Sequence, residues 1–183
     1  ADKKYGILVL RLVKYDGAGN VLWAESVGGT DSDIGLNAVT DTFGNVFITG
    51  RFSSPTITIA ATTLTNPYAL QDDIFVIKYD GAGNMLWAKS EGGNKSDEGD
   101  GIATDDFGNV IVTGQFRSNS ITFGNTTLIN PDQMFQTPEY FIVKYDSAGT
   151  VLWAQRAGDD DYDQGYSTTT DAAGNIFVTG NFL

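Results

Sequence analysis

Runs of acidic side chains are the feature of this sequence best suited to binding chemistry, and the densest of them spans residues 159–163. Calcium prefers carboxylate oxygens, and ligands one residue apart are typical of its binding loops. Asp159, Asp161 and Asp163 have that spacing. The sequence therefore offers calcium as a cofactor at these three aspartates, and it suggests no other cofactor.

The same aspartates have a second interpretation, in which they only shape the backbone. Gln164 stands where an EF-hand loop requires glycine, and Thr170 stands where its closing glutamate would be. An aspartate two residues before a glycine also recurs in every repeat, at Asp33, Asp97 and Asp163. Aspartate side chains commonly accept hydrogen bonds from backbone N–H groups in turns. The recurrence favours turn formation over metal binding.

Three tryptophans, Trp23, Trp87 and Trp153, follow equivalent turns and are the candidate ligand-binding side chains. If they were exposed, such a row would bind the apolar faces of sugar rings. Large aromatic side chains are usually packed, however, and each tryptophan lies in an apolar Leu-Trp-Ala sequence. The pattern favours packing between neighbouring sheets, with carbohydrate binding as the alternative.

Acid–base and nucleophilic catalysis have few suitable side chains in this chain. It contains no histidine and no cysteine, so Ser-His-Asp and Cys-His arrangements, disulfides and thiolate metal sites are excluded. The remaining carboxylates recur at equivalent positions of every repeat, as at Asp41, Asp105 and Asp171. An active site usually needs carboxylates in a single, distinct environment. We therefore expect a protein that is not an enzyme.

The charge balance narrows the class of partner. The chain has 23 acidic and 11 basic residues, a formal net charge of −12. Phosphate backbones and anionic lipids both require a basic surface, so nucleic acid and membrane surfaces are not expected partners. No apolar run approaches the roughly 20 residues of a membrane-spanning helix. A protein or a glycan is the expected partner.

The elements that position these residues are revealed by an internal repeat. The segment 14–24, which reads Lys-Tyr-Asp-Gly-Ala-Gly-Asn-Val-Leu-Trp-Ala, returns with small changes at 78–88 and 144–154. A second block at 41–50 returns at 105–114 and 171–180. The offsets are 64 and 66 residues for both blocks, so chance cannot account for them.

Each block predicts a β-hairpin, because two β-rich runs flank a turn of Asp, Gly and Asn. Two hairpins give four antiparallel strands in each repeat, and their nearly continuous apolar runs indicate sheets covered on both faces. Stacked four-stranded sheets are typical of propellers. We expect an all-β single domain over 1–183: part or half of a β-propeller ring, built from about three four-stranded antiparallel blades. The repeat units are approximately 9–72, 73–138 and 139–183, the last one truncated.

The period exceeds the roughly 40 to 50 residues of common propeller repeats, and the extra residues can be located in the sequence. Residues 56–64 and 120–128 are related segments that lie between the second hairpin of one repeat and the first hairpin of the next. They predict an extra hairpin or arm that projects from one face of each blade. Insertions of this kind often form the working face of a repeat protein.

Together, the Lys-Tyr-Asp strand, the Gly-Asn turns, Leu-Trp-Ala, Asp-x-Gly and Val-Thr-Gly resemble the bacterial β-propeller repeat called SBBP. The resemblance covers nearly the whole chain, and Arg11 departs from it where Phe75 and Phe141 stand. It implies a secreted or cell-surface protein of Gram-negative bacteria. The implied function is a non-enzymatic extracellular module for recognition or scaffolding. The alternatives are a carbohydrate-binding, lectin-like propeller and, less favoured, a fragment of a propeller-based polysaccharide lyase or hydrolase.

Closure of the ring sets a further expectation. Three blades cannot close a ring that usually holds about four to eight. We expect the missing blades to come either from the rest of a longer parent chain or from a second copy that completes a six-blade ring.

Overall fold

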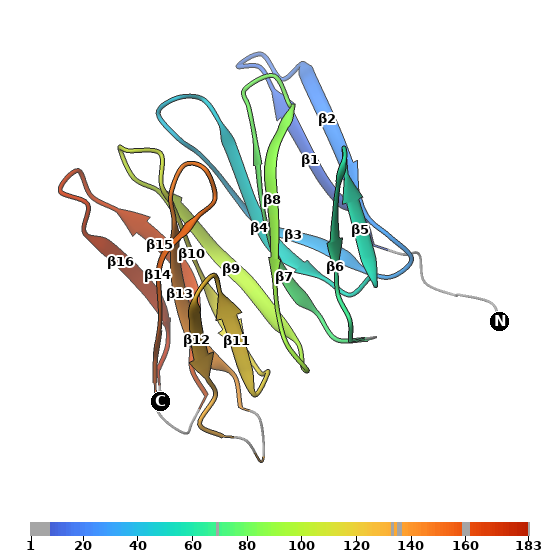
Figure 1. The fold of residues 1–183 in the computed structure, drawn as a ribbon. Coiled ribbons are helices and arrows are strands. Elements are labelled where there is room, and N and C mark those ends of the chain that lie inside the picture. The colour runs from blue at the N-terminus through green and yellow to red at the C-terminus, as the bar shows by residue number, and fades with distance from the viewer. Residues whose placement is uncertain (1–7, 69, 133, 135–136, 159–161, 183) are drawn as a thin grey trace.

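The computed structural model describes residues 8–68, 70–132, 134, 137–158 and 162–182, and these residues form strands and turns (Figure 1). Within these ranges no helix is long and apolar enough to cross a membrane. The strands are β1 (Leu10–Tyr15), β2 (Val21–Val27), β3 (Asp33–Thr40), β4 (Val46–Phe52), β5 (Thr56–Ile59), β6 (Thr62–Thr65), β7 (Asp73–Tyr79), β8 (Met85–Glu91), β9 (Asp97–Thr104), β10 (Val110–Phe116), β11 (Ser120–Phe123), β12 (Thr126–Ile129), β13 (Glu139–Tyr145), β14 (Val151–Ala157), β15 (Gln164–Thr170) and β16 (Ile176–Asn181).

Four antiparallel sheets stand side by side in a row that follows the chain from its N-terminal to its C-terminal end (Figure 1). The two central sheets have four strands each, in the orders β3-β4-β7-β8 and β9-β10-β13-β14. The two sheets at the ends of the row, β1-β2 and β15-β16, have two strands each. The prediction of an all-β chain of repeated hairpins is therefore confirmed. The described sheets form an open row and do not close into a ring.

The expectation of three four-stranded blades, each built within one sequence repeat, was wrong in one respect. We call β1-β2, β7-β8 and β13-β14 the outer hairpins, and β3-β4, β9-β10 and β15-β16 the inner hairpins. Each complete sheet joins an inner hairpin to the outer hairpin of the following repeat, through β4–β7 and β10–β13. A hairpin pattern in sequence specifies its own two strands but not the hairpin beside it. The result is two complete sheets and two halves.

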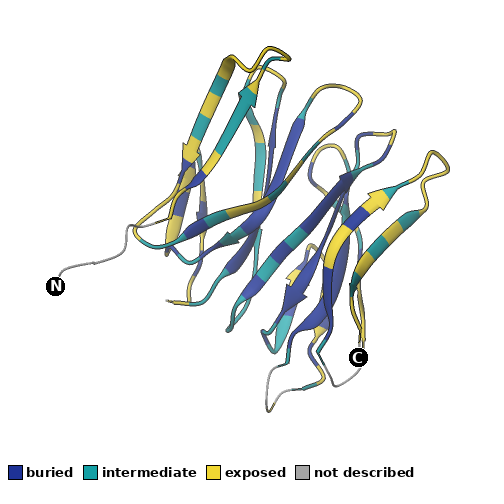
Figure 2. Cartoon of the chain, turned by 180° about the vertical axis from the view of Figure 1, so that it is seen from behind, coloured by how far each residue is buried: buried dark blue, intermediate teal, exposed yellow. Residues whose placement is uncertain are grey.

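Apolar side chains fill the spaces between neighbouring sheets. One buried cluster joins Phe47 and Val76 of the first complete sheet to Val110 and Val143 of the second. Equivalent clusters lie between the first complete sheet and β1-β2, and between the second and β15-β16. Burial is deepest in the middle of the row, and exposed residues are concentrated toward its two ends (Figure 2). Packing between sheets therefore supplies the core, as in other stacked repeats.

The extra segments form the two small hairpins β5-β6 and β11-β12, which we call the side hairpins. The predicted hairpins are present, but they do not project freely. Ile57, Ile59 and Leu64 are buried in the cluster between the first two sheets of the row. β5 contacts β2, and β6 contacts β8. Each side hairpin thus covers the seam between neighbouring outer hairpins, because its apolar face is stabilised by burial there.

Candidate interaction surface

Six tight turns, one per inner or outer hairpin, hold the aspartates that repeat along the sequence. In the first turn Oδ1 of Asp16 accepts hydrogen bonds from the backbone N–H groups of Ala18 and Asn20, both at 2.8 Å. The side-chain amide of Asn20 donates to the other carboxylate oxygen at 2.8 Å. Gly19 has a φ of 86°, a conformation that favours glycine. The backbone bonds recur at Asp41, Asp80, Asp105, Asp146 and Asp171.

Hydrogen bonds favour the ionised carboxylate at Asp16, Asp80 and Asp171. The side-chain hydrogen bond from Asn20, followed by its backbone N–H, lowers the pKa of Asp16. The pKa values of Asp80 and Asp171 are lowered by the same pair of bonds, from Asn84 and Asn175. These side chains therefore make turns, and they add negative charge to the end of the molecule where the turns gather (Figure 1).

Two phenylalanines at this end of the molecule were missed by the sequence analysis. Phe43 is 71% exposed and Phe107 is 79% exposed, and both lie at equivalent positions in the turns of inner hairpins. A side-chain carbon at Gly108 would come within 3.2 Å of the Phe43 ring, so this ring lies against the next turn. The signal in the sequence was an aromatic residue inside a tight Asp-x-Phe-Gly-Asn turn, because a side chain in such a turn lies away from the hydrophobic core. We call Phe43 and Phe107 the turn-face aromatics.

The aspartates that precede glycine in each repeat are buried and bind backbone groups. Oδ2 of Asp33 accepts hydrogen bonds from the Gly29 N–H and the Ser54 hydroxyl, both at 2.8 Å. Asp97 accepts a bond of 2.7 Å from the Ser118 hydroxyl and bonds from two backbone N–H groups. These carboxylates join loops that are far apart in sequence, which is a larger role than the turn formation expected.

The predicted calcium ligands do not form a described site. Asp163 is buried at the start of an inner hairpin, like Asp33 and Asp97, while Asp159 and Asp161 lie outside the described residues. Among the residues that the structure describes, no three acidic side chains gather in a way that could hold a metal ion. Calcium at this loop stays a prediction.

The tryptophans lie at the seams between sheets. The indole N–H of Trp23 donates to the carbonyl of Gly81 in the next outer turn, at 3.2 Å, and its ring is 6.3 Å from that of Tyr79. Trp87 repeats this arrangement with Ser147, at 3.2 Å, and with Tyr145, at 6.3 Å. Their rings also cover glycines of the next turn, Gly83 and Gly149.

The third tryptophan has a different environment. Trp153 is half-buried against the cluster that contains Ile142 and Ile176, on the last complete sheet. No described sheet follows at the position where the first two tryptophans find their tyrosine and turn. The sugar-binding role of the three tryptophans stays a prediction, and their geometry accounts for the first two as packing between sheets.

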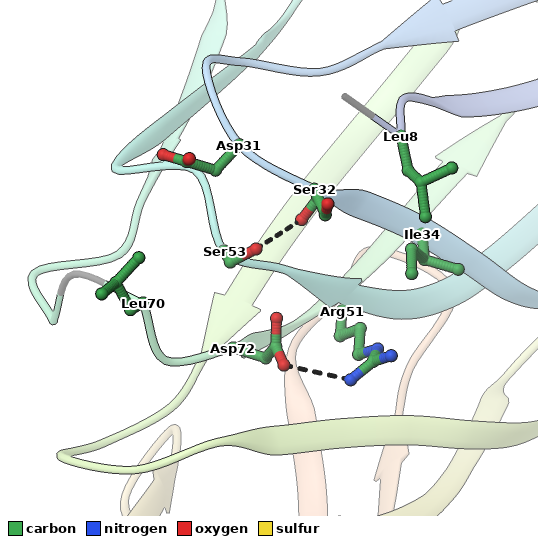
Figure 3. Close-up of a pocket in the computed structure, with 8 residues that line it drawn as sticks. All are labelled: Leu8, Asp31, Ser32, Ile34, Arg51, Ser53, Leu70 and Asp72. Atoms are coloured by element: carbon green, nitrogen blue, oxygen red, sulfur yellow. Dashed lines mark hydrogen bonds and ion pairs between the residues drawn. The ribbon is translucent and has the colours of Figure 1, made fainter. Parts of the chain in front are cut away.

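A shallow cavity of about 400 Å³ lies at the ends of the strands opposite the turns, and Figure 3 shows its lining. Nη1 of Arg51 binds the carboxylates of Asp72 at 3.1 Å and Glu98 at 2.8 Å. Ser53 donates to the carbonyl of Ser32 at 2.7 Å. The charged groups of the cavity are largely paired with one another, so it offers a small polar hollow and no nucleophile beside a base.

Buried carboxyl groups elsewhere have raised pKa values without forming an open site. Burial, reinforced by the charges of Asp97 and Asp72, raises the pKa of Asp73 to about 7. Burial also raises the pKa of Asp97 to about 7, against the effect of its hydrogen bonds. Raised carboxyl pKa values can indicate acid catalysis, but both side chains are covered and Asp97 binds backbone groups. They are structural in this fold.

Comparison with known proteins gives two informative similarities, and no family model matches the chain. An uncharacterized WD repeat-containing protein of Acanthamoeba polyphaga mimivirus is 30% identical over 125 residues, which are 66% of this chain and 9% of the relative. The regulatory protein FlaEY of Caulobacter vibrioides is 26% identical over 192 residues, covering 98% of this chain and 20% of the relative. The chain thus spans a fifth or less of these curated relatives. Fold and similarity together define an all-β repeat protein of stacked antiparallel sheets.

Proposed function

We propose that this chain is a segment of a β-propeller that acts as a non-enzymatic protein-recognition scaffold, and that its turn-face aromatics are the anchor of the recognition surface. The exposure of Phe43 and Phe107 on rigid, repeated turns carries the proposal. Aromatic side chains are enriched among the residues that dominate protein interfaces. Similarity to a WD repeat-containing protein supports a repeat scaffold. Resemblance to SBBP repeats supports a place at the cell surface.

The surroundings of the turn-face aromatics define the chemistry of the partner. A side-chain carbon at Gly81 would lie 3.1 Å from the carbonyl oxygen of Gly44, so the outer turn that contains Asp80 touches the inner turn that contains Phe43. The lowered pKa of Asp80, caused first by the Asn84 side chain, keeps its carboxylate ionised at neutral pH. Aromatic faces flanked by carboxylates attract guanidinium and ammonium groups. We therefore propose a basic partner segment that presents arginine or lysine beside an apolar side chain.

Selection from a displayed peptide library tests this proposal. Peptides selected on the native protein should be rich in arginine and lysine. Their affinity should fall at least tenfold when Phe43→Ser and Phe107→Ser are combined, because the two exposed aromatic contacts are lost. A tenfold fall in affinity corresponds to about 1.4 kcal/mol of binding free energy. The control is Leu86→Ser, which removes a half-exposed apolar side chain from outer strand β8.

The outcome that would contradict the proposal is equally specific. Peptide binding that survives the double substitution would remove the turn-face aromatics from the recognition surface. Binding on a glycan array that is lost in Trp153→Ala but kept in the phenylalanine variant would instead support a carbohydrate-binding role. Circular dichroism of each variant establishes that the β structure is retained.

A further inference from the structure

A pocket of about 340 Å³ lies at the seam between the outer hairpins β1-β2 and β7-β8. Its lining comes from β2, from the side hairpin β5-β6, and from β7, β8 and the turn between them. The side hairpin lies across the seam, with β5 in contact with β2 and β6 in contact with β8 (Figure 1). Each of the three hairpins has both of its strands paired. The pocket is thus formed by complete hairpins.

Two polar side chains in the lining have no partner among the described residues. Tyr79 is 1% exposed, and its hydroxyl group is buried without a hydrogen bond. Glu25 is half-buried on β2, and it forms no ion pair or side-chain hydrogen bond with a described residue. A buried hydroxyl without a partner is destabilising, and such groups are rare in folded proteins. The two side chains therefore give the pocket a polar wall with unused hydrogen-bonding capacity.

These two polar groups lie near each other, beside the ring of a tryptophan. Burial, followed by the negative charge of Glu25, raises the pKa of Tyr79 to about 12, so the hydroxyl keeps its proton at neutral pH. The ring of Trp23 lies 6.3 Å from that of Tyr79 and covers Gly83, which lines the pocket. A carboxylate beside aromatic rings attracts organic cations.

Larger side chains fill the equivalent space at the second seam, between the outer hairpins β7-β8 and β13-β14. Phe123 stands at the position of Ile59 and is 0% exposed. Gly124 stands at the position of Ala60, and a side-chain carbon built there would lie 3.1 Å from Val151. Ala60 lines the pocket of the first seam with a φ of 50°, a conformation that is unfavourable for alanine. The first seam is therefore the more open of the two.

The second seam also carries the opposite charge at the position of the acidic side chain. Lys89 is the repeat equivalent of Glu25, and its Cε lies 3.3 Å from a side-chain carbon built at Gly149 of the next outer turn. Burial raises the pKa of Glu91 to about 7, and the nearby charge of Lys89 acts in the opposite direction. Burial, followed by the charge of Glu91, raises the pKa of Tyr145 well above its usual value. At the second seam an ammonium group of the chain itself therefore lies near a carboxyl and a buried tyrosine.

From this comparison we propose that the first seam binds a small organic cation, whose ammonium group has the role that the Lys89 ammonium has at the second seam. The ammonium group donates hydrogen bonds to the Glu25 carboxylate and the Tyr79 hydroxyl. The apolar part of the ligand contacts Ile59 and Met85, which line the same pocket. The volume of the pocket is near the lower end for ligand sites, which suits a small amine. The turn-face aromatics do not line this pocket, so the inference is independent of the recognition role proposed above.

Titration calorimetry with two matched probes tests the proposal. n-Pentylamine carries an ammonium group at neutral pH, whereas 1-pentanol has the same apolar body without a charge. The amine should bind the native protein saturably at roughly 0.15 M salt, where nonspecific attraction to the acidic surface is screened. The alcohol should bind more weakly by about tenfold or more, because it lacks the charged donor. Tryptophan emission should change as the amine binds, because the Trp23 ring lies against the lining.

Substitutions in the lining locate the site. Glu25→Gln should weaken amine binding by about tenfold or more, because the charged acceptor is lost. Tyr79→Phe should weaken it by about fivefold, because one neutral hydrogen bond is lost. Two controls should leave the affinity unchanged: Lys89→Gln alters the second seam, and Asp106→Asn removes the same charge as Glu25→Gln from an exposed turn. Circular dichroism establishes that each variant keeps its β structure.

Each of four results would overturn the proposal. The first two are an absence of saturable amine binding and equal affinities for the amine and the alcohol. The third is an unchanged amine affinity in Glu25→Gln or Tyr79→Phe. The fourth is an equal loss of affinity in Glu25→Gln and Asp106→Asn, which would assign amine binding to the net charge of −12 instead of the pocket.

Discussion

The carboxylate of Asp97 lies at the start of an inner strand and binds the loop that follows β10. It accepts hydrogen bonds from the Ser118 hydroxyl at 2.7 Å and from the N–H groups of Arg117 at 3.0 Å and Ser118 at 3.1 Å. We expect Asp97→Ala to lower the free energy of unfolding by about 2 to 3 kcal/mol, because buried donors lose their acceptor. Urea denaturation measures the loss. Replacement of the exposed turn residue Asp106 by alanine should change it by less than about 0.5 kcal/mol, and equal effects would refute the structural role.

Trp87 provides a second test at the residue scale. It contacts Phe47 of its own sheet and Tyr145 across the seam, and it donates a hydrogen bond to Ser147. Trp87→Ala should cost about 3 kcal/mol, in the range for removal of a packed aromatic side chain. Thermal or urea unfolding measures it, with the half-exposed Leu86→Ala as the matched control. A nearly neutral Trp87→Ala would favour an exposed sugar-binding platform.

The sequence predicted the chemistry of single residues better than their partners. Recurrence of Asp-x-Gly indicated aspartates that bind backbone N–H groups, but the serine that Asp33 binds, Ser54, is 21 residues away and has no signal of its own. For Trp23 the sequence favoured packing between sheets, but it did not identify the tyrosine and the turn of the neighbouring sheet that the ring contacts. Phe43 was passed over because its turn was interpreted through its aspartate and glycine alone.

The side hairpins are elements whose role can be measured directly. Ile57 is buried between β5-β6 and the outer strands, whereas Thr58 faces away and pairs with the Thr63 hydroxyl at 3.1 Å. Ile57→Ala should lower the free energy of unfolding by about 2 to 4 kcal/mol, as for other buried isoleucines. Thr58→Ala should cost less than about 0.5 kcal/mol. Chemical denaturation measures the free energy of unfolding of both variants. A neutral Ile57→Ala would instead support an arm that projects freely from the sheets.

At the scale of elements, the hairpins follow from local sequence, whereas the grouping of hairpins into sheets does not. The turn aspartates mark every hairpin of the inner and outer sets, so their existence follows from local sequence. Which hairpins share a sheet depends on the pairing of β4 with β7 across a 20-residue segment that contains the side hairpin β5-β6, and no local pattern specifies that pairing. The alternation of threonine and isoleucine over 56–59 was an available sign that one face of the side hairpin is buried.

The pH dependence of stability belongs to the whole molecule, because several buried carboxyls act together. Burial raises the pKa values of Asp73, Glu91 and Asp97 to about 7, and that of Asp100 to about 6. Unfolded aspartate and glutamate titrate near pH 4. Between about pH 4 and 7 the folded state therefore binds more protons than the unfolded state, and the free energy of unfolding falls as the pH rises.

Thermal unfolding from pH 3.5 to 8 checks this expectation. The melting temperature should be highest near pH 4 to 5 and lower by roughly 5 °C or more at pH 8. Below this optimum the turn carboxylates, such as Asp16 with its lowered pKa, lose stabilising hydrogen bonds as they are protonated. Asp73→Asn should flatten the decline above pH 5, while Asp106→Asn should not. Constant stability from pH 5 to 8 would contradict the role of the buried acids.

The whole molecule was predicted in class and only partly in arrangement. Repetition and turn chemistry predicted stacked antiparallel sheets, and the structure has them. The pairing of β4 with β7 and of β10 with β13 joins hairpins of neighbouring repeats, and it depends on contacts that are distant in sequence.

The two kinds of connection between hairpins differ in length, and this has a mechanical consequence. β2 ends at Val27 and β3 begins at Asp33, so neighbouring sheets are linked by a short segment, whereas β4 and β7 of one sheet are linked through the long segment 53–72. Under tension along the chain, the short segment keeps β2 and β3 of neighbouring sheets close together. Strands β4 and β7 of one sheet can move apart only after the side hairpin β5-β6, which lies within 53–72, has unfolded.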